Sequence, residues 1–357
     1  MELLTADLSD VVGELPRRLL VAGGAGFIGS AFVRLLLAAE GAPQITVLDK
    51  LTYAGNLRNL EEVEAHSSFR FVKGDICDLE LTDKLARECD CIVNFAAESH
   101  VDRSILDPDA FIRTDVYGTY SLLEAARRHH HERFLQVSTD EVYGDVEAPH
   151  LSVESDPARP RSPYSASKAG AELQCFAYHA TYGLPVLVTR GSNTYGPFQY
   201  PEKIVPLFIT QALDGGPLPV YGDGGAVRDY LYVDDHALGI ALVLARGTAG
   251  SAYNLGQGDP PLDGMTVARS VLQLVGRGEE LIQHVADRPG HDRRYALDSA
   301  QARALGWIPL LDFERGMGRT VDWYQRRRDW WEPIKSGEFL EFYRRNYRPL
   351  EGAGTGS

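Results

Sequence analysis

The residues of this chain with the clearest chemical potential follow a short apolar run over residues 134–137. Ser138, Thr139, Asp140 and Glu141 come directly after that run. The run is typical of a buried strand, and open parallel sheets bind ligands where their strands end. The stretch therefore predicts a ligand-binding site at the end of a strand.

A second pair, Tyr164 and Lys168, is four residues apart on a predicted helix and so shares one helical face. A lysine beside a phenol favours the phenolate and lowers the pKa of the phenol from about 10. Such a pair can take a proton from a hydroxyl group. By itself this spacing is common on solvated helix faces. It gains meaning from the dinucleotide-binding pattern that precedes it in the chain.

That pattern begins with a glycine-rich turn after the strand predicted over residues 18–22. The turn contains Gly23, Gly26 and Gly29 and leads into a helical apolar period. Glycine allows the tight turn and lets the backbone approach a pyrophosphate at a helix N-terminus. A second strand then ends at Asp49, about 20 residues further on, where a carboxylate binds both hydroxyls of an adenosine ribose. This order of elements indicates NAD as the cofactor and disfavours its 2′-phosphorylated relative.

Strands and helices continue to alternate along the first half of the chain. Further strands are predicted over residues 45–48, 69–72, 91–95 and 185–190, and helices over residues 27–39, 79–88, 108–129 and 164–182. The alternation predicts an α/β fold with a doubly wound, parallel Rossmann sheet. Beyond Asn193 prolines and glycines cluster, which predicts a smaller, loop-rich C-terminal substrate lobe.

The predicted domain division follows from this change of character. Residues 17–195 are expected to form the NAD-binding Rossmann domain, rejoined by about residues 229–257, and residues 196–347 the substrate lobe. The two ends, residues 1–16 and 351–357, are expected to be flexible, and residues 351–357 are small and polar.

The composition argues against several other classes of protein. The 357 residues carry a net charge of −14, which argues against nucleic acid and anionic membrane as partners. No apolar run approaches the roughly 18 residues of a membrane span. Four irregularly spaced cysteines predict free thiols in a reducing cytoplasm. Three consecutive histidines, residues 129–131, cannot all face one ion, so we expect a solvated helix end and no metal site.

Together these residues resemble the extended short-chain dehydrogenase/reductases that modify nucleotide sugars, and among them the dTDP-glucose 4,6-dehydratases. The resemblance runs from Arg18 to Tyr347, nearly the whole chain. Besides the glycine turn, its motifs are Leu51–Asn56 (LTYAGN), Gly74–Ile76 (GDI), Ala96–Ser104 (AAESHVDRS), Ser138–Gly144 (STDEVYG), Tyr164 with Lys168, Pro201–Lys203 (PEK), Tyr221–Gly224 (YGDG) and Arg288–Asp292 (RPGHD). The Asp-Glu pair of STDEVYG is the most specific of them, because the related 4-epimerases lack it.

The resemblance implies NAD-dependent oxidation at C4 of a hexose, with the hydride returned at C6. It implies that Tyr164 takes the proton of the 4-hydroxyl, that Thr139 steadies this oxygen, and that Lys168 holds the tyrosine and the nicotinamide ribose. The 4-ketone acidifies the C5 proton, which Glu141 then removes. Asp140, protonated, gives its proton to the departing 6-hydroxyl. The expected product is a 4-keto-6-deoxyglucose nucleotide.

The resemblance also implies two sets of binding residues and an assembly. The cofactor set is Gly23, Gly26, Phe27, Ile28, Gly29, Asp49, Lys50, Thr52, Asp75, Ile76, Ala96, Ala97, Ser99, Tyr164, Lys168 and Thr194. The set for a nucleoside-diphosphate sugar, a TDP-hexose, is Ser99, His100, Thr139, Asn193, Glu202, Lys203, Tyr221, Arg228, Asn254, Arg288, His291 and Asp292. Basic members of the second set would gather positive charge around the diphosphate. A homodimer formed through two helices is the expected assembly.

Two positions depart from the family's pattern. Thr194 stands where the family's Asn-Asn-Tyr-Gly-Pro has its second asparagine, and Asp115 stands for the asparagine of its Thr-Asn-Val. An Asn-Thr pair is also typical of the glucuronate decarboxylases, which oxidise C4 and lose the C6 carboxylate as CO₂. The alternative enzyme is therefore a TDP- or UDP-glucuronic acid decarboxylase that yields a 4-keto-pentose or xylose nucleotide.

A non-enzymatic relative that only senses NAD is a third hypothesis. Such relatives usually lose the tyrosine, the lysine or the carboxyl pair, and this chain keeps all of them.

Overall fold

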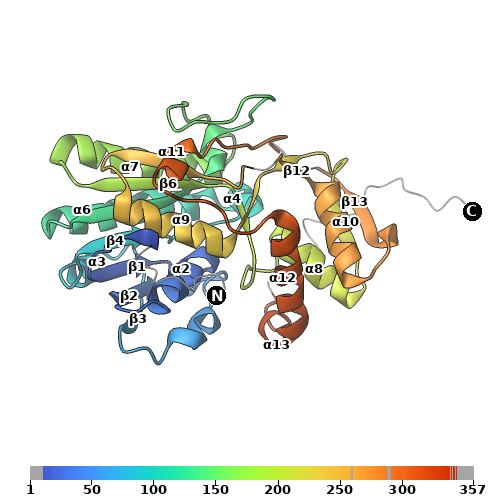
Figure 1. Cartoon of the computed structure of the whole chain (residues 1–357), viewed down its shortest axis with the longest axis horizontal. Helices are drawn as coiled ribbons and strands as arrows, with labels where there is room; N and C mark the ends of the chain where they lie inside the picture. The colour runs from blue at the N-terminus through green and yellow to red at the C-terminus, as the bar shows by residue number, and fades with distance from the viewer. Residues whose placement is uncertain are drawn as a thin grey trace, which may run out of the picture.

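The computed structural model describes residues 11–258, 260–287 and 291–337, together with residues 339, 341 and 343. Its larger lobe is built on a seven-stranded sheet in the order β11-β6-β5-β4-β1-β2-β3 (Figure 1), with every neighbouring pair parallel. The strands are β1 (Arg18–Ala22), β2 (Gln44–Asp49), β3 (Phe69–Lys73), β4 (Cys91–Asn94), β5 (Arg133–Thr139), β6 (Val186–Gly191) and β11 (Ser251–Leu255). The order reverses beside β1, which confirms the predicted doubly wound Rossmann sheet.

Helices cover both faces of this sheet because successive strand residues point to opposite sides. Leu19 and Val21 belong to the core shared with α2 and α9, whereas Leu20 and Ala22 belong to the core shared with α3, α6 and α7. These helices are α2 (Phe27–Leu37), α3 (Leu79–Ala86), α6 (Thr119–Arg128), α7 (Pro163–Tyr182) and α9 (Val233–Arg246). The sheet is therefore buried on both sides.

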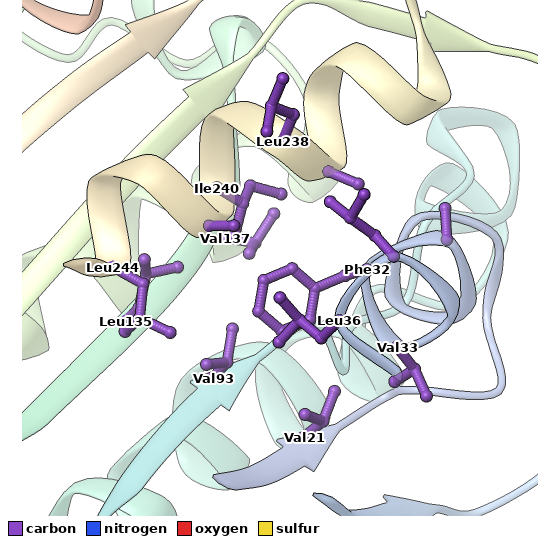
Figure 2. Packing of buried hydrophobic residues seen from close by; sticks show 14 of the residues in the cluster. Val21, Phe32, Val33, Leu36, Val93, Leu135, Val137, Leu238, Ile240 and Leu244 are labelled. Carbon is purple, nitrogen blue, oxygen red and sulfur yellow. The ribbon is translucent and has the colours of Figure 1, made fainter. Parts of the chain in front are cut away.

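The first of these cores holds α2 and α9 against the middle of the sheet. Figure 2 shows Phe32 of α2 and Ile240 of α9 converging over Val21, Val93 and Val137, which come from β1, β4 and β5. All five side chains are at most 6% exposed. This packing fixes the start of α2, and with it the glycine turn, relative to the strand that precedes the carboxyl pair.

The helix predicted over residues 108–129 is divided into three segments. They are α5 (Pro108–Phe111), a π-helical segment η2 (Ile112–Gly118) and α6. Asp115 lies in the π-helical segment and accepts hydrogen bonds from the Glu98 backbone at 2.9 Å and from the Ser167 hydroxyl at 2.5 Å. These bonds tie the segment to α7 and to the residues after β4, and π-helical turns recur at functional sites.

Two predictions about the surface are wrong. Val12 is fully buried, and its carbonyl oxygen accepts a hydrogen bond from Arg246 at 2.9 Å. The flexible end predicted for residues 1–16 therefore does not extend to residues 11–16, and residues 1–10 and 351–357 lie outside the described part. His131 is buried, with its Nε2 2.9 Å from the Ala86 carbonyl oxygen. The histidine tract is thus partly packed into the fold instead of forming a solvated helix end.

The smaller lobe lies beside the carboxyl edge of the sheet (Figure 1) and contains α8, α10, α12 and β13. Its helices and strands are β7 (Asn193–Tyr195), α8 (Ile204–Asp214), β8 (Leu218–Tyr221), β9 (Val227–Arg228), β10 (Tyr230–Tyr232), β12 (Leu262–Asp263), α10 (Gly264–Val275), η4 (Glu279–Leu281), β13 (Ile282–Val285), α12 (Phe313–Arg326) and α13 (Arg328–Trp331). Its core is aromatic, with Tyr324, Trp330 and Trp331 buried. Between these segments α9 and β11 return the chain to the sheet, and α11 (Ala300–Ala304) packs near β11. Within the described residues no helix is both long and apolar enough to cross a bilayer.

Candidate active site

A cavity opens at the carboxyl edge of the sheet, beside the point where the strand order reverses. The glycine turn and the residues after β2, β3, β4, β5 and β6 line it, together with the first turns of α7. The smaller lobe contributes Gln199, Tyr200 and Lys203. Every residue of the predicted cofactor set lines this cavity. Thr139, Asp140 and Glu141 line it as well.

The glycine turn leaves room only for backbone. Gly23 has a φ of +76°, and a Cβ there would lie 2.4 Å from the backbone nitrogen of Ala96. A Cβ at Gly29 would lie 2.4 Å from the carbonyl oxygen of Gly23. Gly26 is the N-cap of α2 and supplies no side-chain cap, so the first N–H groups of the helix remain available at the cavity. Such a helix start suits a pyrophosphate.

The acid at the end of β2 completes the fit to a dinucleotide. Asp49 accepts hydrogen bonds from the backbone of Ala25 at 3.0 Å and of Leu51 at 2.8 Å. Burial raises the pKa of Asp49, and these two donors act in the opposite direction because they favour the carboxylate. Each carboxylate oxygen keeps a second lone pair for a ribose hydroxyl. Next to it, Lys50 Nζ lies 2.6 Å from Asp75 Oδ2 and holds that side chain in the wall.

The carboxyl pair is placed by a tight turn at the end of β5. Thr139 is the last strand residue, and Asp140 and Glu141 open the short helix η3 (Asp140–Tyr143). The Thr139 hydroxyl accepts from the Glu141 backbone at 3.3 Å as a helix cap and donates to Asp140 Oδ1 at 3.1 Å. Both acidic residues consequently line the cavity within one turn of each other.

Tyr164 and Lys168 are placed by the start of α7. Ser162 and Ser165 form a reciprocal capping box with two hydrogen bonds of 3.1 Å, which sets where the helix begins. Tyr164, in the first turn, and Lys168, one turn later, both line the cavity. Lys168 Nζ donates to the Val137 carbonyl oxygen at 2.8 Å, so the lysine also joins α7 to β5.

Asp140 has the surroundings of a proton donor. It is 3% exposed, and its Oδ2 has no hydrogen-bond partner among the described residues. Burial, followed by the charge of Glu141, raises the pKa of Asp140 well above its ordinary value, although Arg228 acts in the opposite direction. A carboxyl group that keeps its proton at neutral pH can serve as a general acid.

The prediction that Lys168 lowers the pKa of Tyr164 is wrong. Burial, followed by the carboxylates of Glu141 and Asp115, raises the pKa of Tyr164 above 10, although a hydrogen bond with Thr139 acts in the opposite direction. Burial also lowers the pKa of Lys168. The local spacing of tyrosine and lysine could not reveal this, because the carboxylates come from other parts of the chain.

A second cavity adjoins the first, and Glu141, Asn193 and Lys203 line both. It lies between α4 (Val101–Leu106) of the larger lobe and α8 and β8 of the smaller one. Members of the predicted substrate set that line it are His100, Asn193, Glu202, Lys203, Tyr221, Arg228 and His291, whereas Ser99 and Thr139 line the first cavity. The second cavity thus has two basic side chains, Lys203 and Arg228, and apolar walls from α8.

The remaining members of the substrate set are not in either wall. Asn254 is fully buried, where its Oδ1 accepts from the Tyr143 hydroxyl at 2.7 Å and its Nδ2 donates to two carbonyl oxygens. Asp292 is buried and accepts from the Tyr295 hydroxyl at 2.5 Å. Both therefore support the fold around the site instead of lining it. Arg288 lies outside the described residues.

Some residues of these walls were not predicted from the sequence. Asp102 and Tyr230 line the second cavity, and Gln199, Ser192 and His236 line the first. Asp102 stands inside the AAESHVDRS motif, which is a usable signal. His236 has no such signal, because it enters the cavity from α9, far along the chain from the glycine turn and the carboxyl pair.

Comparison with known proteins identifies the family. The family model described as GDP-mannose 4,6 dehydratase matches residues 20–320. A dTDP-glucose 4,6-dehydratase from Streptomyces antibioticus is 54% identical over 324 residues, which cover 89% of this chain and 95% of that protein. The crystal structure of DesIV, a dTDP-glucose 4,6-dehydratase from Streptomyces venezuelae with NAD bound, is 52% identical, covers 89% of this chain and 100% of that one, and has a TM-score of 0.86.

The same fold extends to proteins with other activities. A UDP-glucose 4-epimerase from Thermus thermophilus, crystallised with NAD, is 34% identical over 87% of this chain and 99% of its own, with a TM-score of 0.81. The matches cover nearly the whole length of these proteins and include both lobes. The chain belongs to the GDP-mannose 4,6 dehydratase family of the extended short-chain dehydrogenase/reductases.

Proposed function

We propose that this protein is a dTDP-glucose 4,6-dehydratase that keeps NAD as a resident cofactor. The observation that carries the proposal is that Asp140, buried and with a raised pKa, lies next to Glu141 in the wall of the cavity that Tyr164 also lines. The chemistry needs an acid and a base on adjacent carbons, and these side chains supply both. About half of the residues are shared with proteins named dTDP-glucose 4,6-dehydratase, which supports the same activity.

The lining of the first cavity offers a suitable partner for each part of the cofactor. The first N–H groups of α2 would hold the pyrophosphate, Asp49 the adenosine ribose, and Lys168 the nicotinamide ribose. When bound, NAD would supply an acceptor for the hydride from C4 of the sugar and, once reduced, the donor of a hydride to C6. The carboxylate of Asp49 would repel a 2′-phosphate, so NAD is the expected form.

The protein's own groups carry the proton transfers. Tyr164 would take the proton of the 4-hydroxyl as a phenolate, a form that the positive charges of bound NAD and of Lys168 would favour, although burial raises the pKa of this phenol in the protein. The Thr139 hydroxyl would bond to the same sugar oxygen. Glu141 removes the C5 proton once C4 is a ketone. Asp140 gives its proton to the 6-hydroxyl, which leaves as water. Glu141 then returns a proton to C5 when C6 is reduced, so the product is the 4-keto-6-deoxy sugar.

The nucleotide part of the substrate is assigned to the second cavity. Lys203 and Arg228 line it and carry permanent charge for a diphosphate, while Phe208 and Ile204 of α8 offer apolar surface for a pyrimidine base. The Lys203 ammonium binds the Ser99 carbonyl oxygen. Lys203 therefore stands at the boundary between the two cavities.

The decisive experiment offers purified protein dTDP-glucose and, separately, TDP- or UDP-glucuronate. We expect dTDP-glucose to lose the mass of one water. In deuterated water one deuterium should appear at C5, because Glu141 exchanges its proton with solvent before returning it. Release of CO₂ from the glucuronate with dTDP-glucose left unchanged would establish the decarboxylase in place of the dehydratase.

We also propose a homodimer that works in the cytoplasm. Apolar side chains of η2, α6 and α7 are exposed on neighbouring helices, among them Tyr117 at 45%, Leu173 at 64% and Tyr182 at 56%. A second copy of the chain would cover them. All four cysteines are free thiols, which suits a reducing compartment.

A further inference from the structure

His236 of α9 has no place in the proposed mechanism, yet it lies in the wall of the cofactor cavity. Its neighbours there are Gly191, Ser192 and Thr194, which follow β6 beside the end of β5. This is the part of the cavity that also holds the carboxyl pair. The histidine is 1% exposed. A buried imidazole at a reacting centre requires a partner for each ring nitrogen.

Thr194 supplies the partner for one ring nitrogen. Its Oγ1 lies 2.7 Å from His236 Nδ1 and 3.1 Å from the Ser192 carbonyl oxygen. A hydroxyl has a single proton, and a carbonyl oxygen can only accept. Both contacts are satisfied only if Thr194 donates to the carbonyl oxygen and accepts from an N–H at Nδ1. The threonine therefore selects the tautomer that leaves Nε2 unprotonated.

The other ring nitrogen has no partner. Nε2 of His236 is buried and makes no hydrogen bond to any described residue. Its edge of the ring lies against Gly191, where a Cβ would come within 2.6 Å of Nε2. Burial lowers the pKa of His236 to about 4, so the ring is neutral at physiological pH. Nε2 is thus a buried hydrogen-bond acceptor for which the described residues offer no donor.

We infer that the Thr194–His236 pair is a cofactor-binding element whose Nε2 accepts a hydrogen bond from the carboxamide N–H₂ of the nicotinamide ring. The adenosine end of the cavity is occupied by Asp49 and the pyrophosphate turn, so the reacting ring belongs beside Tyr164. The carboxamide is the only N–H donor that NAD carries at that end. The inference rests on the proposed function, because it takes NAD as the occupant.

The departure at Thr194 matters for this pairing. The family's asparagine offers both an N–H donor and a carbonyl acceptor, so it can pair with either tautomer of the ring. The threonine hydroxyl, already donating to the Ser192 carbonyl oxygen, pairs with one tautomer only. The side chain at position 194 therefore determines which tautomer of His236 forms.

The test is an equilibrium titration with three ligands. NAD carries the donor, its 3-acetylpyridine analogue has nearly the same shape without the N–H₂ group, and ADP-ribose lacks the ring altogether. The parent protein should bind NAD about three- to tenfold more tightly than the acetyl analogue, as expected for one neutral hydrogen bond. Thr194→Val removes the hydroxyl at equal size, and we expect the preference to fall to less than twofold. Thr194→Ser keeps the hydroxyl and should keep the preference.

ADP-ribose separates this inference from damage to the fold and from failure of the proposed function. All three proteins should bind it equally, because the pair contacts only the nicotinamide end. If the parent binds neither NAD nor ADP-ribose, the proposed function fails. If it binds both but shows no preference over the analogue, or if Thr194→Val keeps the full preference, the inference fails.

The tautomer provides a second readout in case Thr194→Val binds ADP-ribose poorly. Nitrogen-15 spectra of the histidine side chains should show His236 with its proton on Nδ1, assigned by the shift that Thr194→Ser causes. The Nε2 resonance should move when NAD is added and much less with the acetyl analogue. A proton on Nε2 in the parent protein would overturn the inference.

Discussion

Two neighbouring carboxyl groups at the end of β5 have different surroundings, and that difference assigns their roles. Asp140 is buried with one unpaired oxygen, whereas Glu141 is partly exposed at the junction of two cavities. Burial favours the protonated form of a carboxyl group because the charged form loses its hydration. We therefore propose that the buried member is the acid and its neighbour the base.

Asp140→Asn should separate oxidation from elimination. Asparagine keeps the size of the side chain but has no proton to transfer. With dTDP-glucose, the variant should still generate the absorbance of the reduced cofactor, while release of product falls by roughly 10²–10⁴-fold. Stopped-flow absorbance and product mass report the two steps. Normal product release would remove Asp140 from the role of acid.

Tyr164→Phe should have the opposite kinetic signature. The substitution removes the oxygen that takes the C4 proton and keeps the ring, which packs edge-on against Phe111. Turnover should fall by roughly 10²–10⁴-fold, and no reduced cofactor should accumulate with dTDP-glucose. The dissociation constant for NAD should change by less than the loss in turnover. Accumulation of reduced cofactor at the parent rate would show that another group takes the proton.

Asp115, a departure from the family's asparagine, should make stability depend on pH. Burial raises the pKa of Asp115 to about 6 from 3.8, with the charge of Lys168 acting in the opposite direction. Because the folded state holds the proton more tightly than the unfolded state, this carboxyl costs stability as pH rises from about 4 to 6. In Asp115→Asn that cost disappears. Ser167 can accommodate the amide, because its hydroxyl can turn its single proton to the Tyr164 carbonyl oxygen and accept from the asparagine N–H.

Relative to the parent protein, Asp115→Asn should gain stability between pH 4.5 and pH 7. The free energy of unfolding of the variant, measured by urea titration, should rise by about 2 kcal/mol relative to the parent over this interval. Parallel pH profiles of the two proteins would show that Asp115 does not titrate in this range.

At the scale of elements, short turns at the carboxyl ends of strands position most of the residues that line the first cavity. The glycine turn after β1 contacts the backbone after β4, and the turn after β5 carries the carboxyl pair. The π-helical segment η2 adds a third support, because Asp115 bonds both to the residues after β4 and to α7. Residues from segments far apart in the chain thereby meet at one edge of the sheet.

Gly23→Ala should destabilise the fold through this turn. Alanine at a φ of +76° is strained, and its Cβ would overlap the Ala96 backbone at 2.4 Å. We expect a loss of roughly 2–4 kcal/mol in the free energy of unfolding and weaker NAD binding. Gly183→Ala is the matched control, because Gly183 has a φ of +69° but no atom within 4 Å of its Cβ position. Equal losses in both variants would mean that close packing at Gly23 contributes nothing.

At the scale of the whole molecule, the substrate cavity depends on how the two lobes meet. Trp330 of the smaller lobe donates from its indole to Asn59 Oδ1 at 3.0 Å, and Arg58 forms an ion pair with Asp329 at 2.5 Å. Near the cavity, Arg103 of α4 pairs with Glu202 at 3.0 Å. These contacts join the smaller lobe to the larger one. The second cavity is lined by residues of both lobes.

Leu173→Glu should break the proposed dimer. Leu173 is 64% exposed on α7, and a charge there would be buried without a partner if α7 packs against a second copy. Light scattering should show a dimer for the parent and a monomer for the variant at the same concentration. Ile308→Glu is the control, because Ile308 is 62% exposed in the segment between α11 and α12, outside the helices of the proposed interface, and should leave the dimer intact. A dimeric Leu173→Glu would place the interface elsewhere.

The sequence by itself determined the features that depend on neighbours along the chain. The alternation of apolar runs predicts the parallel sheet, and the spacing of Gly23, Gly26 and Gly29 predicts the phosphate turn. The carboxyl ends of parallel strands lie on one edge, so Asp49 and the carboxyl pair had to meet at one cavity. These signals are local, and a few residues of context are enough to read them.

Only the tertiary structure decided properties that arise through space. The pKa of Tyr164 rises instead of falling because the phenol is buried and because the carboxylates of Glu141 and Asp115 approach it from other segments of the chain. Asn254 supports the fold because the Tyr143 hydroxyl and two carbonyl oxygens use its polar groups. His236 reaches the cofactor cavity from α9, far along the chain from the glycine turn. Burial and charge depend on which distant segments pack together, and no local pattern records that.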